Sequence, residues 1–373
     1  MKRIGISQIR CISSLGQGEE VWENYKKGSP FLNGLKESSA VFLQNKLKSK
    51  ISDFVNSRKD LLKLDPSVHY LLYLTQGLVL TPGAQTGINI ASSRGATHLF
   101  EDYFDQFRSE EQTAVLSSPT TTLGNLSSWM AHELGLNGFE MSHSITCSSG
   151  LHALVNGVIW LESGRSSEFV IGASEASNTP FTIAQMSALK ICQYNSDDDL
   201  PIRAMDFEKS KNTMAVSEGA GIAVLTSDLT RCEFYISGVG YATEKVEHPA
   251  AISANGSSFQ KAMKMALKDA KLENVDAIVM HAPGTVKGDL SELFAIEQVF
   301  GDEIPALTNN KWIIGHTLGA SGLHSLEMAT LMLKHQEFIE NPLYPQKGPG
   351  RLEHIMVNAV GFGGNAVSVI ISR

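Results

Sequence analysis

The sequence predicts an α/β protein in which two related halves repeat the same order of strands and helices. Strand-like apolar segments alternate with helix-like segments, which is typical of a layered α/β architecture. Each half begins with a short strand-like segment, at residues 4–9 and 235–240. Each half also closes with a glycine turn that leads into an apolar strand, at residues 218–225 and 361–371. This repetition indicates a duplication.

Each half also holds one helix that is apolar on nearly all sides, at residues 148–161 and at about 323–335. A helix without a polar face belongs in a core, so both helices are expected between layers of the fold. The first half carries extra sequence at residues 31–90, where amphipathic helices are predicted over 40–54 and 66–80.

The two halves are predicted to pack as one unit, with an N-terminal half at residues 1–228 and a C-terminal half at residues 229–373. No linker rich in proline, serine or glycine separates them, and residues 226–231 have the character of a short turn.

Composition limits the class of protein before any motif is considered. The chain has 373 residues, of which 42% are hydrophobic, so it can bury a large core. Its net charge of −8 argues against a basic nucleic-acid-binding protein. No apolar run is long enough for a membrane span. The first residues lead directly into a strand-like segment without a secretory signal, which favours a cytoplasmic location.

The cysteines do not form a metal-binding or disulfide pattern. They are scattered and lack the C-x-x-C spacing of zinc sites, at Cys11, Cys147, Cys192 and Cys232. This pattern favours a reduced compartment, with no disulfide framework and no metal site.

The segment S-I-T-C-S-S-G at residues 144–150 carries the clearest chemical signal. A strand-like approach and a tight turn place Cys147 at the start of the first buried helix. Unpaired backbone N–H groups at a helix N-terminus favour the thiolate. Small neighbouring residues leave room for a substrate. Taken alone, however, a lone cysteine in such a place is more often an inert core residue.

Two histidines lie at the ends of predicted elements, where α/β proteins build their sites. His281 ends a buried strand and precedes a loop marked by Gly284 and Gly288. His316 precedes the second buried helix, with Lys311 five residues before it. Taken alone, each histidine is more often structural.

The G-F-G-G segment at residues 361–364 predicts a tight turn. Its glycine backbone can approach another segment closely and direct an N–H group toward an oxyanion. As a phosphate loop it is weak, because the GxxxxGK[ST] pattern is absent. A plain tight turn is the alternative.

Together and in this order, the four segments resemble the β-ketoacyl-acyl carrier protein synthases, of the elongating type with one cysteine and two histidines. The family's T-A-C-S-S appears here as Thr146, Cys147, Ser148 and Ser149, with Ile145 ahead of them. Its H-G-T-G-T-x-x-G-D-x-x-E is matched at His281, Gly284, Thr285, Gly288, Asp289 and Glu292. Its K-x-x-x-G-H-x-x-G-A-x-G is matched at Lys311, Gly315, His316, Gly319, Ala320 and Gly322. Its N-x-x-G-F-G-G is matched at Asn358, Gly361, Phe362, Gly363 and Gly364.

This resemblance implies the thiolase-like fold, a duplicated five-layer α-β-α-β-α arrangement of two mixed sheets around buried helices. It also implies an acyltransferase that performs a decarboxylative Claisen condensation. Cys147 holds the acyl group, and its N–H forms an oxyanion hole with that of Phe362, which is also a candidate gate. His281 and His316 bind the thioester carbonyl of the malonyl group and support its decarboxylation.

The resemblance assigns supporting roles to further residues of the same motifs. Lys311 is expected to orient the site through Glu292 or a backbone group, with a solvated surface lysine as the alternative. The other supporting residues are Thr285, Asp289, Glu292, Gly363 and Gly364. No metal and no cofactor of its own is expected, because the substrates are carried on the phosphopantetheine of an acyl carrier protein.

The expected partners are this carrier protein and a second subunit, either another copy or a related ketosynthase-like chain. An acidic carrier needs a basic patch on this net acidic chain, and the predicted docking residues are Arg58, Lys59 and Lys63. A solvated surface explains such a run of charges equally simply. The pathway is expected to be fatty acid synthesis or a specialised polyene or polyketide-like lipid synthesis.

The sequence also departs from the family pattern, which indicates a divergent member. Ala282 and Pro283 replace the usual Gly-Thr, and Ser325 stands where a glutamate is expected, with Glu327 nearby. One alternative is therefore a chain-length-factor-like subunit that shapes a partner's tunnel without condensing anything. Such subunits characteristically lose the cysteine, which is present here. A second alternative, a Cys-His hydrolase, has no need of the second motif histidine with its lysine.

Overall fold

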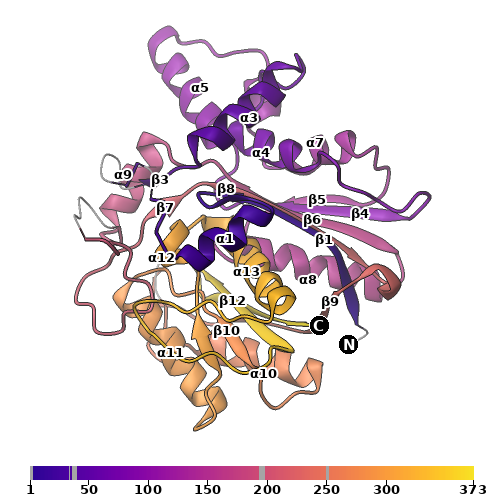
Figure 1. The fold of residues 1–373 in the computed structure, drawn as a ribbon. Coiled ribbons are helices and arrows are strands. Elements are labelled where there is room, and N and C mark those ends of the chain that lie inside the picture. The colour runs from indigo at the N-terminus through magenta and orange to yellow at the C-terminus, as the bar shows by residue number, and fades with distance from the viewer. Residues whose placement is uncertain (1–2, 33, 36–39, 193–197, 249–251) are drawn as a thin grey trace.

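A large mixed β-sheet is the central feature of the computed structural model, which describes residues 3–32, 34–35, 40–192, 198–248 and 252–373 (Figure 1). Its strands are hydrogen-bonded in the order β11-β10-β12-β13-β9-β1-β8-β6-β4-β5. Their bounds are Ile4–Ser13 (β1), Thr86–Ala91 (β4), Glu140–His143 (β5), Glu168–Glu175 (β6), Gly219–Thr226 (β8), Phe234–Thr243 (β9), Ala277–Val279 (β10), Ala306–Thr308 (β11), His354–Gly361 (β12) and Asn365–Ser372 (β13).

The two halves of this sheet have the same strand order and the same strand directions. In the N-terminal half, β1 and β8 and then β8 and β6 pair antiparallel, whereas β6, β4 and β5 run parallel. In the C-terminal half, β9 and β13 and then β13 and β12 pair antiparallel, whereas β12, β10 and β11 run parallel. This repetition confirms the predicted duplication.

The two predicted mixed sheets are joined edge to edge. Residues 4–6 of β1 pair antiparallel with residues 234–236 of β9, so hydrogen bonding runs from one half into the other. The predicted border between residues 228 and 229 lies in the connection from β8 to β9, beside the 3₁₀ helix Leu229–Arg231. The border itself stays a prediction.

Helices cover both outer faces and fill the space between the halves, which gives the five expected layers (Figure 1). In the middle, α8 (Ser149–Glu162) packs against β4 and β6, and α13 (Ser321–His335) packs against β12 and β1. On one outer face, α4 (Pro66–Leu74) and α7 (Asn125–Glu133) cover the N-terminal strands. On the other, α10 (Ser257–Ala270) covers β9 and β13, and α11 (Val286–Phe300) packs on α10.

The two central helices differ in how completely they are buried. Most residues of α13 are buried, as its apolar sequence predicts. α8 also lies between the layers as predicted, but its Ile159 is 50% exposed, so one side of this helix is open in the single chain.

The two predicted helices of the extra N-terminal sequence are real but shorter than expected. Residues 40–41 form β3 and pair with β7 (Val216–Ser217), so α3 begins only at Asn45 and ends at Asn56. The Asp65 carboxylate accepts the Ser67 N–H and starts α4, which ends at Leu74 rather than residue 80. Local amphipathic patterns could not reveal the β3–β7 pairing, because its partner is far along the chain.

The remaining elements connect these layers. They are β2 (Gly16–Gln17), which pairs with β1, and the helices Glu19–Lys27 (α1), Thr97–Glu110 (α5), Ser117–Thr121 (α6), Pro180–Ala188 (α9), Lys311–Ile314 (α12) and the 3₁₀ helix Leu318–Ala320. Within the described ranges, none of the helices has the length and apolarity that crossing a membrane requires.

Candidate active site

Cys147 lies in a sharp turn between β5 and α8, as its motif predicts. Its neighbour Thr146 has a φ of 48°, a conformation that non-glycine residues adopt only where the surroundings hold them. The Thr146 hydroxyl donates to the Phe362 carbonyl at 3.4 Å, and the Ser148 hydroxyl donates to the Asn365 Oδ1 at 2.6 Å. The cysteine turn is therefore fixed against the turn between β12 and β13.

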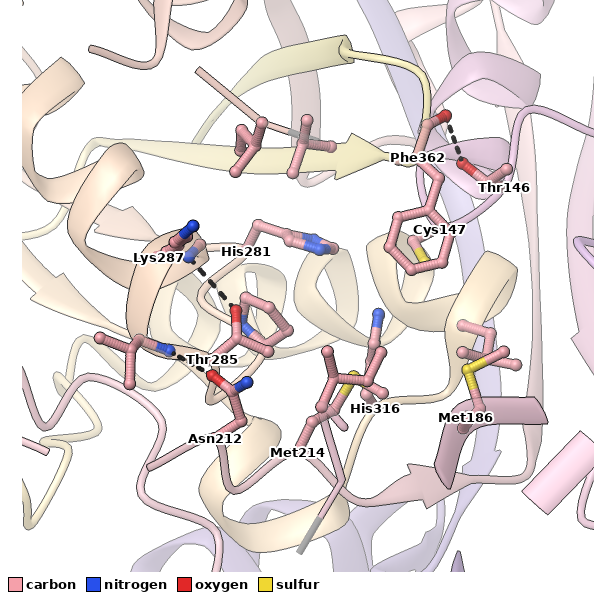
Figure 2. A pocket seen from close by; sticks show the side chains of 18 of the residues that line it. Thr146, Cys147, Met186, Asn212, Met214, His281, Thr285, Lys287, His316 and Phe362 are labelled. Atoms are coloured by element: carbon pink, nitrogen blue, oxygen red, sulfur yellow. Dashed lines mark hydrogen bonds between the residues drawn. The ribbon is translucent and has the colours of Figure 1, made fainter. Parts of the chain in front are cut away.

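That second turn is the predicted glycine turn, and it brings Phe362 to Cys147. Gly363 and Gly364 have φ values of +94° and +72°, which explains why glycine stands at both positions. The Phe362 side chain is 38% exposed, and Figure 2 shows its ring beside Cys147. Its roles in an oxyanion hole and as a gate stay predictions.

Glu292 fixes the backbone around His281, which follows β10. Its two carboxylate oxygens accept the N–H groups of His281 at 2.9 Å and Ala282 at 2.8 Å. The Asn358 side chain donates to the same carboxylate at 3.1 Å. Burial raises the pKa of Glu292 to about 7. Glu292 therefore holds the backbone that carries His281, and its supporting role in a reaction stays a prediction.

Asp289 organises the loop after His281 in the same way. Its carboxylate accepts the N–H groups of Gly284 at 3.0 Å and Thr285 at 3.2 Å. It also forms a buried ion pair with Lys209 at 2.8 Å. Thr285 caps α11 by accepting the Gly288 N–H, so Gly288 belongs to the helix and not to the expected loop. Lys209 belongs to none of the four motifs, so its ion pair with Asp289 was not predicted.

Replacing Lys209 by alanine is expected to lower the free energy of unfolding by about 3–5 kcal/mol, because the Asp289 charge would remain buried without its partner. Denaturant unfolding monitored by circular dichroism measures the change. Lys264→Ala, at an exposed position on α10, is the matched control. Equal stability of the two variants would contradict a structural role for the ion pair.

His316 is held from a different segment and faces His281. Its N–H donates to the Ala215 carbonyl at 2.7 Å, and its carbonyl accepts the Ser217 N–H at 2.9 Å. The two imidazole rings lie edge to face, with centroids 5.2 Å apart. Burial, and then the nearby Lys311, lowers the pKa of both histidines well below the usual value, so both rings are neutral at pH 7.

Lys311 is buried, so the surface alternative for this residue is wrong. Its Nζ forms no hydrogen bond with any described residue, so the expected direct contact with Glu292 or a backbone group is absent. Burial lowers its pKa to about 8, against the raising effect of Glu292. Ser325, which stands in place of the expected glutamate, is also buried, and its Oγ has no partner among the described residues.

The sulfur and both imidazoles line one cavity of about 790 Å³. Figure 2 shows Cys147, His281 and His316 directed toward a common space. Thr285 and Phe362 also line it, whereas the other predicted site residues do not: Lys311, Asp289, Glu292, Gly363 and Gly364. Sequence reasoning missed several lining residues that hold no motif position: Arg94, Lys211, Asn212, Met214 and Lys287. Met186 and Lys190 also line the cavity.

The electrostatics of Cys147 differ from the expectation for a helix N-terminus. Burial, and then the buried Glu175, raises the pKa of the Cys147 thiol to about 12. Lys311 and Arg94 act in the opposite direction but do not outweigh these effects. Burial therefore disfavours the thiolate that the helix N-terminus was expected to favour.

Alkylation of Cys147 by iodoacetamide is therefore expected to accelerate about tenfold per pH unit from pH 7 to pH 10, since only the thiolate reacts. Peptide mass spectrometry follows the modification, and Cys147→Ser identifies background labelling. An alkylation rate that is already constant above pH 7 would show instead that the helix N-terminus lowers the pKa of the thiol more than burial raises it.

The predicted docking residues do not line this cavity. Arg58 is engaged within the fold, because its guanidinium donates to Glu133 at 2.7 Å and to Asp60 at 2.7 Å. These carboxylates, Asp60 first, raise the pKa of Arg58 above its usual value. Lys59 and Lys63 are exposed, and their contact with a carrier stays a prediction.

Comparison with known proteins gives a consistent result over the whole chain. The model of the β-ketoacyl synthase N-terminal domain matches residues 6–230, and that of the C-terminal domain matches residues 234–342. The chain is 27% identical to 3-oxoacyl-[acyl-carrier-protein] synthase 1 of Buchnera aphidicola, with full coverage of both.

Solved structures share the fold. The ishigamide ketosynthase/chain length factor aligns with a TM-score of 0.84 at 21% identity, over 100% of this chain and 99% of that one. The chain also aligns with the structure of a type II polyketide synthase acyl-carrier protein in complex with its ketosynthase. The TM-score is 0.84 at 18% identity, with the same coverage.

Proposed function

The chain belongs to the β-ketoacyl synthase family, and from this premise we infer that Cys147 accepts an acyl group and condenses it with a malonyl thioester. The observation that carries this function is the shared cavity: a cysteine and two neutral histidines from distant segments line one space. The enzyme is an acyltransferase that releases a β-ketoacyl thioester and CO₂.

The first half-reaction moves the acyl group. The Cys147 sulfur attacks the carbonyl carbon of an acyl-carrier thioester, forming a new S–C bond. The bond from that carbon to the carrier sulfur breaks, and the carrier thiol leaves with the proton lost by Cys147. The N–H groups of Cys147 and Phe362 are proposed to bind the oxyanion in between.

The second half-reaction forms the carbon–carbon bond. The malonyl carboxylate leaves as CO₂, and its bonding electrons form an enolate on the thioester. His281 and His316 donate N–H hydrogen bonds to the enolate oxygen, which is why neutral rings suit the role. The enolate carbon attacks the acyl-cysteine carbonyl, and the Cys147 sulfur departs and recovers a proton.

Lys311 acts through the histidines in this proposal. Its buried charge helps to keep both imidazoles unprotonated, so that each retains one N–H donor and neither becomes a cation. Its unpartnered Nζ supports a role in the electrostatics of the site, and Asp289 and Glu292 hold the surrounding backbone.

The substrates are proposed to arrive on the phosphopantetheine of an acyl carrier protein, with no metal and no cofactor of the enzyme itself. The basic side chains of Lys211 and Lys287 on the cavity wall support the recognition of a phosphate there. In one of the similar solved structures, an acyl-carrier protein is in complex with its ketosynthase, which supports a carrier protein as the partner.

A dimer, either of two copies or with a related subunit, is also proposed. Phe100, Phe104 and Phe107 of α5 are more than half exposed, and such an apolar surface is typical of a protein interface. The ishigamide relative combines a ketosynthase with a chain length factor. A cytoplasmic location remains a prediction from the sequence.

The proposed reaction is tested with malonyl-carrier labelled with ¹³C at the free carboxyl group and with a panel of saturated acyl-carriers. The expected result is one labelled CO₂ for each β-ketoacyl-carrier formed. Release of neither product with any chain length would favour the chain-length-factor alternative, in which a partner subunit performs the chemistry.

A further inference from the structure

The cavity is basic although the chain as a whole is acidic. The net charge of the chain is −8, yet the described lining residues include four basic side chains and one acidic side chain, Glu247. Three of the four, Lys190, Lys211 and Lys287, are exposed lysines. The fourth, Arg94, is partly buried, so it is the basic group whose interactions are least weakened by water.

Arg94 lies on the side of the cavity away from Thr285. Its guanidinium donates to side chains of α9, to Thr182 at 3.2 Å and to Gln185. Met186 follows Gln185 on α9, and Figure 2 shows Met186 on the opposite side of the histidines from Thr285 and Lys287. Because the phosphate of the carrier's arm is proposed to bind Lys211 and Lys287, and Lys287 lies on the Thr285 side, Arg94 belongs to the side left for the acyl chain.

The guanidinium is held in place but its charge is not paired. Thr182 is fully buried, and Ser92 accepts the backbone N–H of Arg94 at 3.3 Å and that of Gly95 at 2.8 Å, which shapes the loop. Among the described residues, Arg94 forms no ion pair, and only one of its guanidinium nitrogens has a hydrogen-bond partner. The remaining N–H donors are free to bind a ligand.

An apolar surface lines the cavity beside the reacting sulfur. Met186, Met214 and Leu318 belong to one buried apolar cluster, and Cys147 packs against it. All three line the cavity. The flexible methionine side chains can adapt to an alkyl stem of several shapes. The cavity therefore offers apolar contact near the sulfur as well as the guanidinium of Arg94.

We propose that Arg94 selects acyl groups that carry a carboxylate a few carbons from the thioester. The alkyl stem lies against Met186, Met214 and Leu318, and the carboxylate accepts hydrogen bonds from the guanidinium. This inference rests on the proposed function, since it concerns the acyl group that Cys147 receives. A methyl-terminated chain would instead leave the charge of Arg94 partly desolvated without a partner, which disfavours its binding.

The test compares two acyl-carriers of the same shape, glutaryl-carrier and 5-methylhexanoyl-carrier, in which two methyl groups replace the carboxylate oxygens. Acylation of Cys147 is followed by intact-protein mass spectrometry. The wild type is expected to accept glutaryl about 10- to 100-fold faster, the range of a hydrogen bond to a charged group. Arg94→Leu is expected to reverse or abolish this ratio, and Arg94→Lys to keep part of it.

Lys264→Leu removes a positive charge from an exposed position of α10 outside the cavity and is expected to keep the wild-type ratio. Equal acylation of the wild type by both substrates would overturn the inference but leave the proposed function standing. If Arg94→Leu and Arg94→Lys each slow acylation by both substrates equally, Arg94 acts on the reactivity of the Cys147 thiol or on the stability of the fold. That result would also overturn the inference. No acylation of the wild type by either substrate or by any saturated acyl-carrier would overturn the proposed function itself.

Discussion

Replacing Cys147 by alanine is expected to lower condensation by a factor of about 10⁴ or more, because among the described residues no other cysteine lines the cavity to hold the acyl chain as a thioester. Slow loss of CO₂ from malonyl-carrier is expected to continue, since that step needs the His281 and His316 donors and not the sulfur. Chromatography of β-ketoacyl-carrier and a separate assay of labelled CO₂ measure the two steps.

Cys232→Ala is the matched control for this experiment. Cys232 lies between the 3₁₀ helix Leu229–Arg231 and β9 and does not line the cavity, so the control is expected to keep full activity. Condensation that survives in the Cys147→Ala variant would contradict the assignment of the nucleophile. Loss of both steps would show that the alanine disturbs the turn against Phe362 and Asn365, and Cys147→Ser would then separate structure from chemistry.

Replacing His316 by alanine is expected to lower condensation about 10²- to 10³-fold, the usual effect of removing one donor to a developing oxyanion. Acylation of Cys147 is expected to stay within a few-fold of the wild type, because the enolate forms only after that step. The measurement is a single-turnover assay that follows the acyl adduct and its consumption by malonyl-carrier separately.

His316→Asn is the matched variant, because its amide retains an N–H donor. It is expected to recover part of the activity that His316→Ala loses. If both variants block acylation and condensation equally, the role of His316 is in the structure of the cavity and not in enolate stabilisation.

The parts of the site that the sequence could predict are those with local signatures. Cys147 precedes a buried apolar helix, and His281 follows a short strand. The glycine turn at residues 361–364 can be predicted from its glycines alone. The duplicated fold could also be predicted, because both halves repeat one order of elements. Identical strand directions in the two halves confirm it.

Contacts between distant segments could not be predicted in this way. The Lys209–Asp289 ion pair, the β3–β7 pairing and the position of Arg94 against α9 all join residues with no common motif. Electrostatic effects of burial were also missed. A helix N-terminus suggests a thiolate, but the surroundings of Cys147 desolvate the sulfur and add the carboxyl group of Glu175. Motif positions therefore predict which residues meet, and packing decides their protonation.

The most direct test of the central claim is the mass of the Cys147-containing peptide before and after malonyl-carrier is added to protein pre-incubated with an acyl-carrier. The expected result is an acyl adduct on Cys147 that disappears on addition, together with release of β-ketoacyl-carrier. If Cys147 carries no adduct with any saturated or carboxylate-bearing acyl-carrier, the chain does not perform this condensation.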